Sequence, residues 1–301
     1  MHTNFIPQQD YTLFNLIASG QVDWVPHAPA RPQTEKARAS YEKLWQPEEI
    51  MASYAIYINH NGPLSDVRVR RALALALPRD ELWQFNSYFT PLQGIVPPTL
   101  PNYPHRDIWL PHKSPTPPPQ FFNPELARQL LAEAGFPAGE GLPTFTLAGS
   151  QSGAVPTVLN IITQSWLNEL GIQVETAQFE WNNFFNEMPS FNFYLRVTIA
   201  NIPNPLIFLT PFDGGQLLRG YHNHNFSSLL RQAEASATLE ELFALASEAE
   251  RILVLEDQAV IPLFTYVYAN LINLNKWESW QPNHRGLHTW VGIRLRDDYV
   301  F

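Results

Sequence analysis

Apolar side chains recur at helical spacing in four segments of this chain. In the second of them, Leu126, Leu130, Leu131 and Ala134 occupy positions i, i+4, i+5 and i+8, so they share one face of a helix. Polar and charged residues fill the positions between them, as is typical of a helix that packs one side against a core. The pattern predicts helices over residues 67–77, 125–134, 157–170 and 239–255.

Residues with capping chemistry stand at the ends of these segments. Asn123 precedes the second, Pro124 occupies its first turn and Gly135 follows it, which is the expected order of start and stop signals. Thr238 and Glu241 form a capping box at the start of the fourth segment, because each side chain can satisfy a free backbone amide of the other residue. These signals support the predicted boundaries.

Five apolar or alternating runs predict strands. The last is long and rich in Tyr, Ile and Leu, as a buried strand would be. The third helix is followed by Gly171 and then directly by a strand, which is half of a βαβ unit. Residues 91–124 are dense in proline and predict an extended loop. We therefore expect an α/β or mixed α+β fold with strands at 52–59, 144–148, 172–179, 191–199 and 260–273.

Composition narrows the class of protein. The 301 residues are 45% hydrophobic, which allows a sizeable core and about two domains or one large one. Cysteine is absent, so disulfides, thiolate metal sites and cysteine nucleophiles are excluded. The net charge of −9 argues against a nucleic-acid partner. We interpret the carboxylates of the fourth helix, Glu248 and Glu250 among them, as a solvated face.

Motifs that carry catalysis or hold a cofactor are missing from the sequence. The segment Gly149 to Gly153 resembles a nucleophile elbow, but Gln151 stands where the serine is required, so we interpret it as a glycine–serine turn. No glycine pattern of a dinucleotide site or a P-loop is present. His222 and His224 offer two imidazoles at alternate positions without an adjacent third ligand. We expect no metal, no cofactor and no enzymatic activity.

The most informative signal is a set of segments in a fixed order. The run from Pro63 to Ala72, PLSDVRVRRA, resembles the pattern P-[FL]-x-D-x-R-V-R-x-A of the family 5 extracellular solute-binding proteins. These are the oligopeptide and dipeptide receptors of bacterial ABC importers. Six further segments resemble the family's patterns. They are LIASGQVD (16–23), GIVPP (94–98), NPELA with LLAEAGF (123–136), Trp166 with LGIQV (170–174), Glu180 and Trp181 with Phe184, and AE (249–250) and IL (252–253) with IPLF (261–264).

The resemblance implies a fold and a domain organisation. The fold is a three-layer lobe of the periplasmic-binding-protein-like class II, and family members close two such lobes over a solute by hinge motion. They are longer than this chain, so residues 53–268 are expected to form the C-terminal ligand-binding lobe. Residues 1–52 and 269–301 would then be parts of the first lobe, which is incomplete in this chain.

The resemblance also implies positions for the ligand site. Peptide-binding relatives carry an A-D-Y-x-x-P element whose aspartate pairs with the α-ammonium of the peptide. Here the element reads ANIPNP, with Asn201 in place of the acid. An amide still accepts a hydrogen bond, but the bond lacks the charge that roughly doubles its strength. Thr198 and Ile199 stand where the family has a tryptophan just before this element.

Three aromatic residues complete the predicted ligand-binding set. Trp181 matches the family tryptophan that lines the ligand cavity, and Phe185 falls at a neighbouring lining position. Tyr57 lies on the strand that enters the lobe and is a further candidate for the cavity. Core packing is the alternative role of each of these rings.

Together these matches predict the substrate-binding component of an ABC importer for oligopeptides or similar solutes. It would be a monomer that delivers its ligand to permease subunits and has no nucleic-acid partner. The alternatives are an effector-sensing domain of a transcription regulator, a truncated product that does not bind, and an enzyme with a metal at His222 and His224. The family resides in the periplasm or at the cell surface. The sequence shows no export signal, which by itself predicts a cytoplasmic protein.

Overall fold

The computed structural model describes residues 15–17, 19–28, 44–84, 89–104, 122–151, 153–180, 190–215, 217–283, 286, 288 and 291–298. The main sheet of this described part has eight strands: β1 (Trp24–Ala28), β2 (Trp45–Glu49), β3 (Ala52–Ile58), β4 (Phe89–Pro91), β5 (Phe145–Ser150), β6 (Val174–Phe179), β7 (Phe193–Ile199) and β8 (Val260–Ile272). A small second sheet pairs β9 (Trp277–Glu278) with β10 (Arg294–Leu295).

Helices fill the segments between the strands. They are α3 (Val67–Leu75), α4 (Arg79–Gln84), α5 (Pro124–Glu133), α6 (Val155–Leu170), α8 (Leu206–Leu209), α9 (His224–Glu234) and α10 (Leu239–Arg251). Shorter helical turns are η2 (Gly62–Ser65), η3 (Pro137–Gly139), η5 (Thr210–Gly215) and η6 (Ile252–Glu256). Within the described residues, no helix combines the length and the apolar character that crossing a bilayer requires.

The strand order across the main sheet is β1-β8-β3-β7-β5-β6. β5 runs parallel to both β6 and β7, whereas β3 is antiparallel to β7 and to β8. β8 is the longest strand and changes neighbours along its length. Its first half pairs with β3 and β4, and its second half pairs with β1 and β2. This single strand therefore connects two groups of strands.

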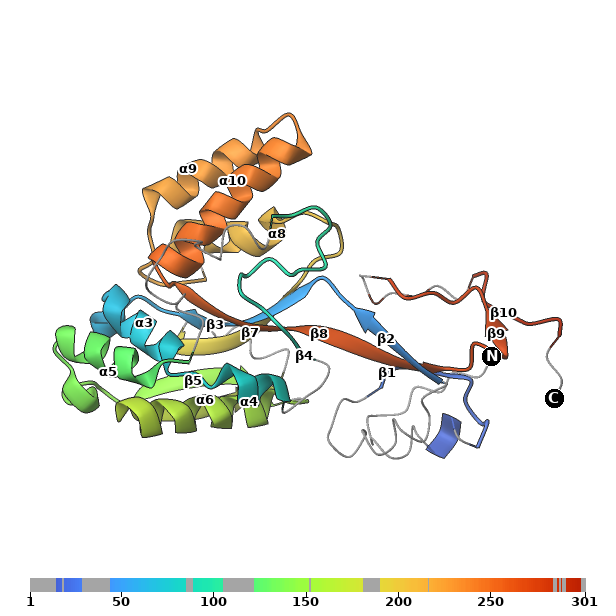
Figure 1. Cartoon of the computed structure of the whole chain (residues 1–301), viewed down its shortest axis with the longest axis horizontal. Coiled ribbons are helices and arrows are strands. Elements are labelled where there is room, and N and C mark those ends of the chain that lie inside the picture. Colours follow the sequence, from blue (N-terminus) through green and yellow to red (C-terminus); the bar gives the residue numbers. More distant parts are fainter. Residues whose placement is uncertain are drawn as a thin grey trace.

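Helices cover both faces of the sheet (Figure 1). On one face α3, α5 and α6 enclose a core that includes Leu73, Trp166 and Phe193. On the other face α8, α9 and α10 enclose a core that includes Tyr194 and Phe212. Phe193 and Tyr194 are consecutive on β7 and enter opposite cores, because side chains alternate along a strand. The predicted mixed α/β fold with three layers is confirmed.

An arm extends from this three-layer body (Figure 1). We define the arm as β1, β2, β8 from Val267 onward, β9 and β10. A buried polar cluster stabilises it: Glu48 Oε2 lies 2.9 Å from His288 Nε2, and Trp280 stacks on the His288 ring with centroids 4.8 Å apart. Trp24 donates its indole N–H to Asn270 at 3.2 Å. The chain passes from arm to body at Ile50 and Met51, between β2 and β3, and again along β8; we call Ile50 and Met51 the junction.

The predicted elements are found with small shifts at their ends. The five strands correspond to β3, β5, β6, β7 and β8, and the four helices to α3, α5, α6 and α10. Asn123 caps its helix as predicted and accepts from the amide of Leu126 at 3.1 Å. The capping box is half formed: Thr238 accepts from the amide of Glu241 at 3.2 Å, whereas the Glu241 carboxylate accepts from the amide of Ala237 at 3.4 Å. The fourth helix ends as an α-helix at Arg251 and continues as the π-helical turn η6.

Two interpretations from the sequence were wrong. Gly149 and Ser150 are not in a turn; they are the last residues of β5. Glycine is needed there because helix α6 packs closely over the strand, and a Cβ on Gly149 would lie 2.9 Å from Cγ1 of Val155. Glu250 is not on a solvated face; it is buried on α10 and accepts hydrogen bonds from the loop after β4.

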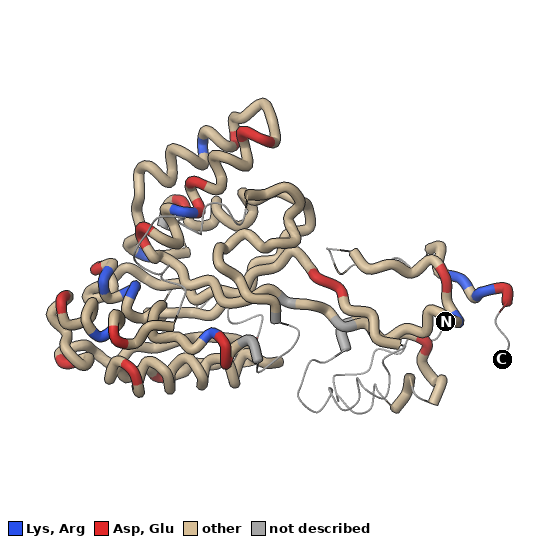
Figure 2. The backbone as a smooth tube through the Cα atoms, in the orientation of Figure 1, with Lys and Arg blue, Asp and Glu red and all other residues tan. Residues whose placement is uncertain are grey.

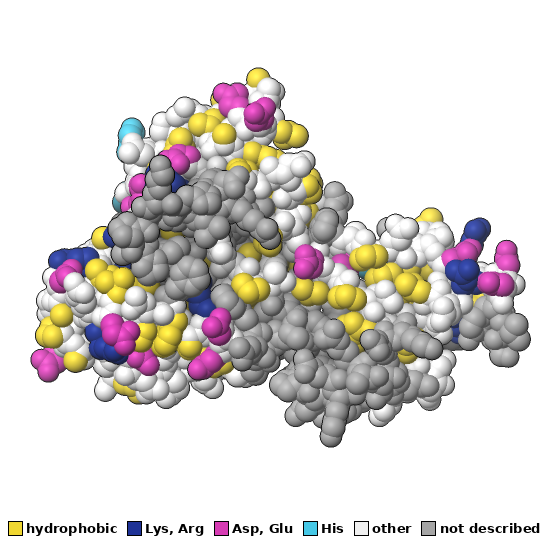
Figure 3. All heavy atoms as spheres, viewed as in Figure 1, with side chains coloured by type: hydrophobic (Ala, Val, Ile, Leu, Met, Phe, Trp, Pro, Cys, Tyr) yellow, Lys and Arg dark blue, Asp and Glu magenta, His cyan; other side chains and the backbone are white. Residues whose placement is uncertain are grey.

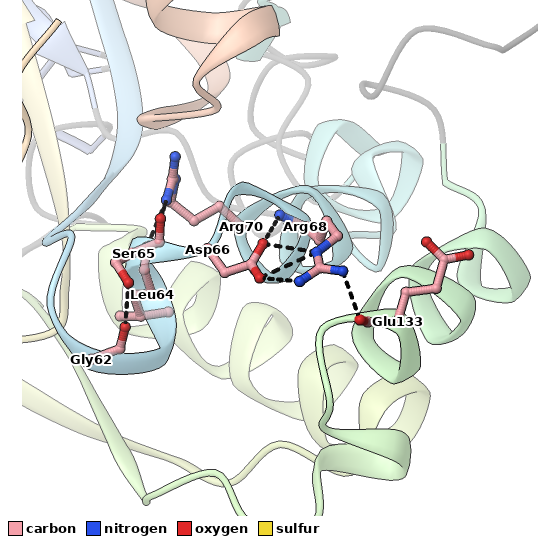
Figure 4. A network of polar contacts seen from close by, with 7 residues as sticks. All are labelled: Gly62, Leu64, Ser65, Asp66, Arg68, Arg70 and Glu133. Atoms are coloured by element: carbon pink, nitrogen blue, oxygen red, sulfur yellow. Dashed lines mark hydrogen bonds and ion pairs between the residues drawn. The ribbon is translucent and has the colours of Figure 1, made fainter.

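The run from Pro63 to Ala72 holds its part of the body together (Figure 4). Asp66 accepts from the backbone amide of Arg68 at 2.8 Å and so caps α3. Arg68 reaches across to the carbonyl of Glu133 on α5 at 2.7 Å. Arg70 donates to the carbonyls of Leu64 and Ser65 at 2.7 and 2.9 Å. The side chains of this segment therefore have a structural role: they cap α3 and join it to α5 and to the turn before it.

Candidate functional site

The ends of three parallel strands define one edge of the sheet. β5, β6 and β7 run in the same direction, so their carboxyl ends meet at this edge. Ser150 at the end of β5 lies beside Phe179 at the end of β6, while β7 continues past both to Ile199. In open α/β sheets, ligands bind outside the carboxyl ends of the strands. We therefore take this edge as the candidate site.

The turn after β7 presents apolar side chains at the edge. Ile199 is 44% exposed and Ile202 is 52% exposed, and Asn201 between them is also exposed. The backbone of the turn is held in place, because the amide of Ala200 donates to the carbonyl of Met51 at 2.8 Å. The amide of Asn204 donates to the carbonyl of Ile202, also at 2.8 Å. An ordered turn thus displays a neutral amide between two isoleucines.

Tyr57 supports this edge from the core. Its hydroxyl lies 2.9 Å from Oγ1 of Thr198, and its ring stacks on Tyr194 with centroids 5.0 Å apart. The Arg196 guanidinium lies 5.8 Å from the Tyr57 ring centroid. Burial raises the pKa of Tyr57, although Arg196 and Thr198 act in the opposite direction. Tyr57 is therefore a neutral phenol, packed in the core, whose hydroxyl reaches Thr198.

A polar pair lies at the ends of the other two strands. The side-chain amide of Gln151 donates to Glu180 Oε1 at 2.7 Å, and its backbone amide donates to the carbonyl of Phe179 at 2.9 Å. This pair was not among the predicted site residues. Part of its signal was available, because Glu180 directly follows the strand predicted at 172–179 and Gln151 lies three residues after the strand predicted at 144–148, and a βαβ unit makes two such strands parallel neighbours.

The predicted site residues are only partly brought together. Tyr57 and Thr198 are in contact, and Ile199 and Asn201 lie on the adjoining turn. Trp181 and Phe185 lie outside the described residues, so their position in the cavity remains a prediction.

Two pockets lie elsewhere in the described part of the body. One, of about 270 Å³, is lined by Asp213, His222 and His224 among others. The other, of about 340 Å³, lies along the outer side of α6. His224 begins helix α9, so the extended geometry considered for the two histidines is wrong. The described residues contain no group of three His, Asp or Glu side chains arranged to hold a metal ion.

Charge is concentrated away from the sheet. Figure 2 shows Lys, Arg, Asp and Glu mainly along the helical layers and near the end of the arm, while most of the central strands are uncharged. On the face shown in Figure 3, hydrophobic side chains follow the sheet from the body toward the arm. A solute at the candidate edge would meet the exposed side chains of Ile199 and Ile202 beside the polar groups of Asn201, Gln151 and Glu180.

Comparison with known proteins agrees with this fold. The family model described as bacterial extracellular solute-binding proteins, family 5 Middle, matches residues 1–217. The chain therefore belongs to this family of solute-binding proteins. It is similar to the dipeptide-binding protein DppE of Bacillus subtilis, with 26% identity over 217 residues, covering 70% of this chain and 39% of the relative. It is 25% identical to the periplasmic oligopeptide-binding protein OppA of Salmonella typhimurium over 302 residues, covering 97% of this chain and 53% of that protein.

The fold itself has solved counterparts. The crystal structure of a periplasmic oligopeptide-binding protein from Borrelia burgdorferi superposes with a TM-score of 0.79 at 22% identity, covering 97% of this chain and 57% of the other. The predicted periplasmic-binding-protein-like fold is thereby confirmed. The chain spans about half the length of the relatives that it matches over most of its own length.

Proposed function

We propose that this chain belongs to the substrate-binding component of an ABC importer for oligopeptides or similar solutes. The observation that carries the proposal is the ordered turn of Ile199, Asn201 and Ile202 at the carboxyl edge of the sheet. Exposed apolar side chains on a fixed backbone mark a binding surface, because a ligand that removes them from water lowers the free energy of the complex. Membership of a solute-binding family supports the same role.

The ligand would lie in a cleft between two lobes. We assign residues 53–268 to the ligand-binding lobe and residues 1–52 and 269–301 to the other lobe. The passage of the chain through the junction and along β8 supports these limits, because the arm and the body are joined at the same two places. Permease subunits would be the partners of the loaded protein, in the periplasm or at the cell surface.

The chemistry of the turn specifies one property of the ligand. Asn201 is neutral and lies between two isoleucines, so it offers no counter-charge to an ammonium group. A ligand group at this point would be uncharged, as in a peptide with a blocked amino terminus. The hydrogen-bond capacity of the amide suits such a group, because it has both donors and an acceptor.

Replacing Asn201 by aspartate is expected to change which peptides bind. Trialanine with a free amino terminus should bind about tenfold more tightly to Asn201→Asp than to the wild type, because a charge-assisted hydrogen bond replaces a neutral one. N-acetyl-trialanine should gain nothing. Isothermal titration calorimetry at pH 7 measures both affinities. Asn204→Asp is the matched control, since it adds the same charge in the same turn. Equal changes for both peptides, or no binding of either by any variant, would contradict the proposal.

A further inference from the structure

Glu250 is a buried carboxyl group that fastens a loop to helix α10. Its side chain is 1% exposed. Oε1 accepts from the backbone amide of Val96 at 2.8 Å, and Oε2 accepts from the hydroxyl of Tyr103 at 2.8 Å. The backbone of Ile95 contributes a further hydrogen bond to the same carboxyl group. Both oxygens of one side chain are thus committed to the loop formed by residues 92–104.

Loop 92–104 also touches the junction between body and arm. It contains no helix or strand, and Ile95, Val96, Leu100 and Tyr103 pack into the core beneath α10. At its middle, Thr99 donates its hydroxyl to the carbonyl of Ile50 at 3.4 Å. The loop therefore connects Glu250 on one side with the junction on the other.

Tyr103 faces Glu250 from loop 92–104 and is the one ionisable residue of this loop. α8 has no charged residue. On α9 and α10, Arg231, Glu234 and Glu248 are exposed, and the half-buried Arg251 is paired with Glu248 and Glu256, both at 2.7 Å. None of them contributes to the shifted pKa of Glu250. Among the residues that the structure describes, hydrogen bonds and no cation hold this carboxyl group.

The burial of Glu250 sets the pH response. Burial raises the pKa of Glu250 from 4.5 to about 7, even though its three hydrogen bonds lower it in part. If the loop opens, water reaches the carboxyl group and its pKa returns toward 4.5. The closed loop is therefore favoured most below pH 4.5, and this advantage is lost as the pH rises toward 7. Above pH 7 the loss is complete, because Glu250 is ionised in both states.

We infer that Glu250 is a proton-dependent latch, which holds loop 92–104 against the junction when its carboxyl group is protonated and releases it when the group is ionised. The latch needs no ligand and goes beyond the proposed binding function. Because Thr99 is part of the loop and bonds to Ile50, the latch would hold the junction more firmly in acid than at neutral pH.

Hydrogen exchange of the loop amides tests the latch. After correction for the intrinsic exchange rate, opening of residues 95–103 in the wild type should increase about tenfold per pH unit between pH 5 and 7 and level off above pH 7. Glu250→Gln keeps the shape without the charge: its amide oxygen can accept from Val96, and its amide N–H can donate to the Tyr103 hydroxyl, which reverses that one bond. Its opening should stay at the low level across the whole range.

Two further measurements keep the test decisive. Tyr103→Phe removes a hydrogen bond that favours the ionised form, so the rise in opening should continue to a higher pH than in the wild type. A carbon-13 titration of the wild-type glutamates should show one carboxyl group with a midpoint near pH 7 that is absent from Glu250→Gln. A flat wild-type exchange profile, the same pH dependence in Glu250→Gln, or no such carboxyl group would overturn the inference.

Discussion

Replacing Arg70 by alanine is expected to lower the free energy of unfolding by about 3–5 kcal/mol. Arg70 is 4% exposed and donates to the carbonyls of Leu64, Ser65 and Asp257, at 2.7, 2.9 and 3.0 Å. Burial lowers the pKa of its guanidinium to about 10, with Asp257 opposing the shift, so the group remains charged at neutral pH. Alanine would leave buried carbonyls on two separate segments without donors.

Urea denaturation of the wild type and two variants measures this loss. Arg128→Ala is the control, because Arg128 is exposed and forms an ion pair with Glu169 at 3.0 Å on the surface. Surface pairs of this kind contribute about 0–1 kcal/mol. The structural role of Arg70 would be refuted by a loss no larger than that of Arg128→Ala.

Replacing Trp166 by alanine is expected to have a similarly large effect, about 3–5 kcal/mol. The indole is fully buried and lies 5.0 Å from the ring of Phe193, measured between centroids. Its Nε1–H donates to the carbonyl of Leu73 at 2.9 Å, so α6 is tied to α3 as well as to the sheet. Alanine would leave a cavity and a buried carbonyl without its donor.

Leu167 provides the control for Trp166. It is the next residue on α6 and is exposed, so Leu167→Ala should cost less than about 0.5 kcal/mol. Thermal unfolding followed by circular dichroism compares the two variants. Equal melting temperatures for Trp166→Ala and Leu167→Ala would show that Trp166 does not anchor the helix.

The central elements could be predicted because their signals are local. Helix α5 has an amphipathic pattern, an Asn cap and a closing glycine within one short segment. β8 is a long and mostly apolar run. The short strands β1, β2 and β4 were missed because each is defined by its pairing with β8 and has little pattern of its own. Helix α9 was not predicted, although a local signal is present, since Asn223 caps it and accepts from the amide of Phe226.

Buried polar groups were the least predictable part. Glu250 lies on an amphipathic helix with several exposed acids, and nothing in its local sequence separates it from them. Its burial results from a loop more than a hundred residues earlier in the chain. The candidate site was only partly predictable, because some of its contacts also join residues that are far apart in the sequence. Thr198, Ile199 and Asn201 follow from one strand, whereas the contact of Thr198 with Tyr57 depends on the pairing of β3 with β7.

Mapping the backbone amides that respond to a ligand tests the central claim most directly. Amide chemical shifts would be recorded while N-acetyl-trialanine is added to the full chain. Binding at the carboxyl edge of the sheet predicts shifts at Ser150, Glu180, Thr198 and Asn201, at the ends of three neighbouring strands. Shifts confined to the pocket at His222 and His224 or to the outer side of α6, or no shifts at all, would contradict it.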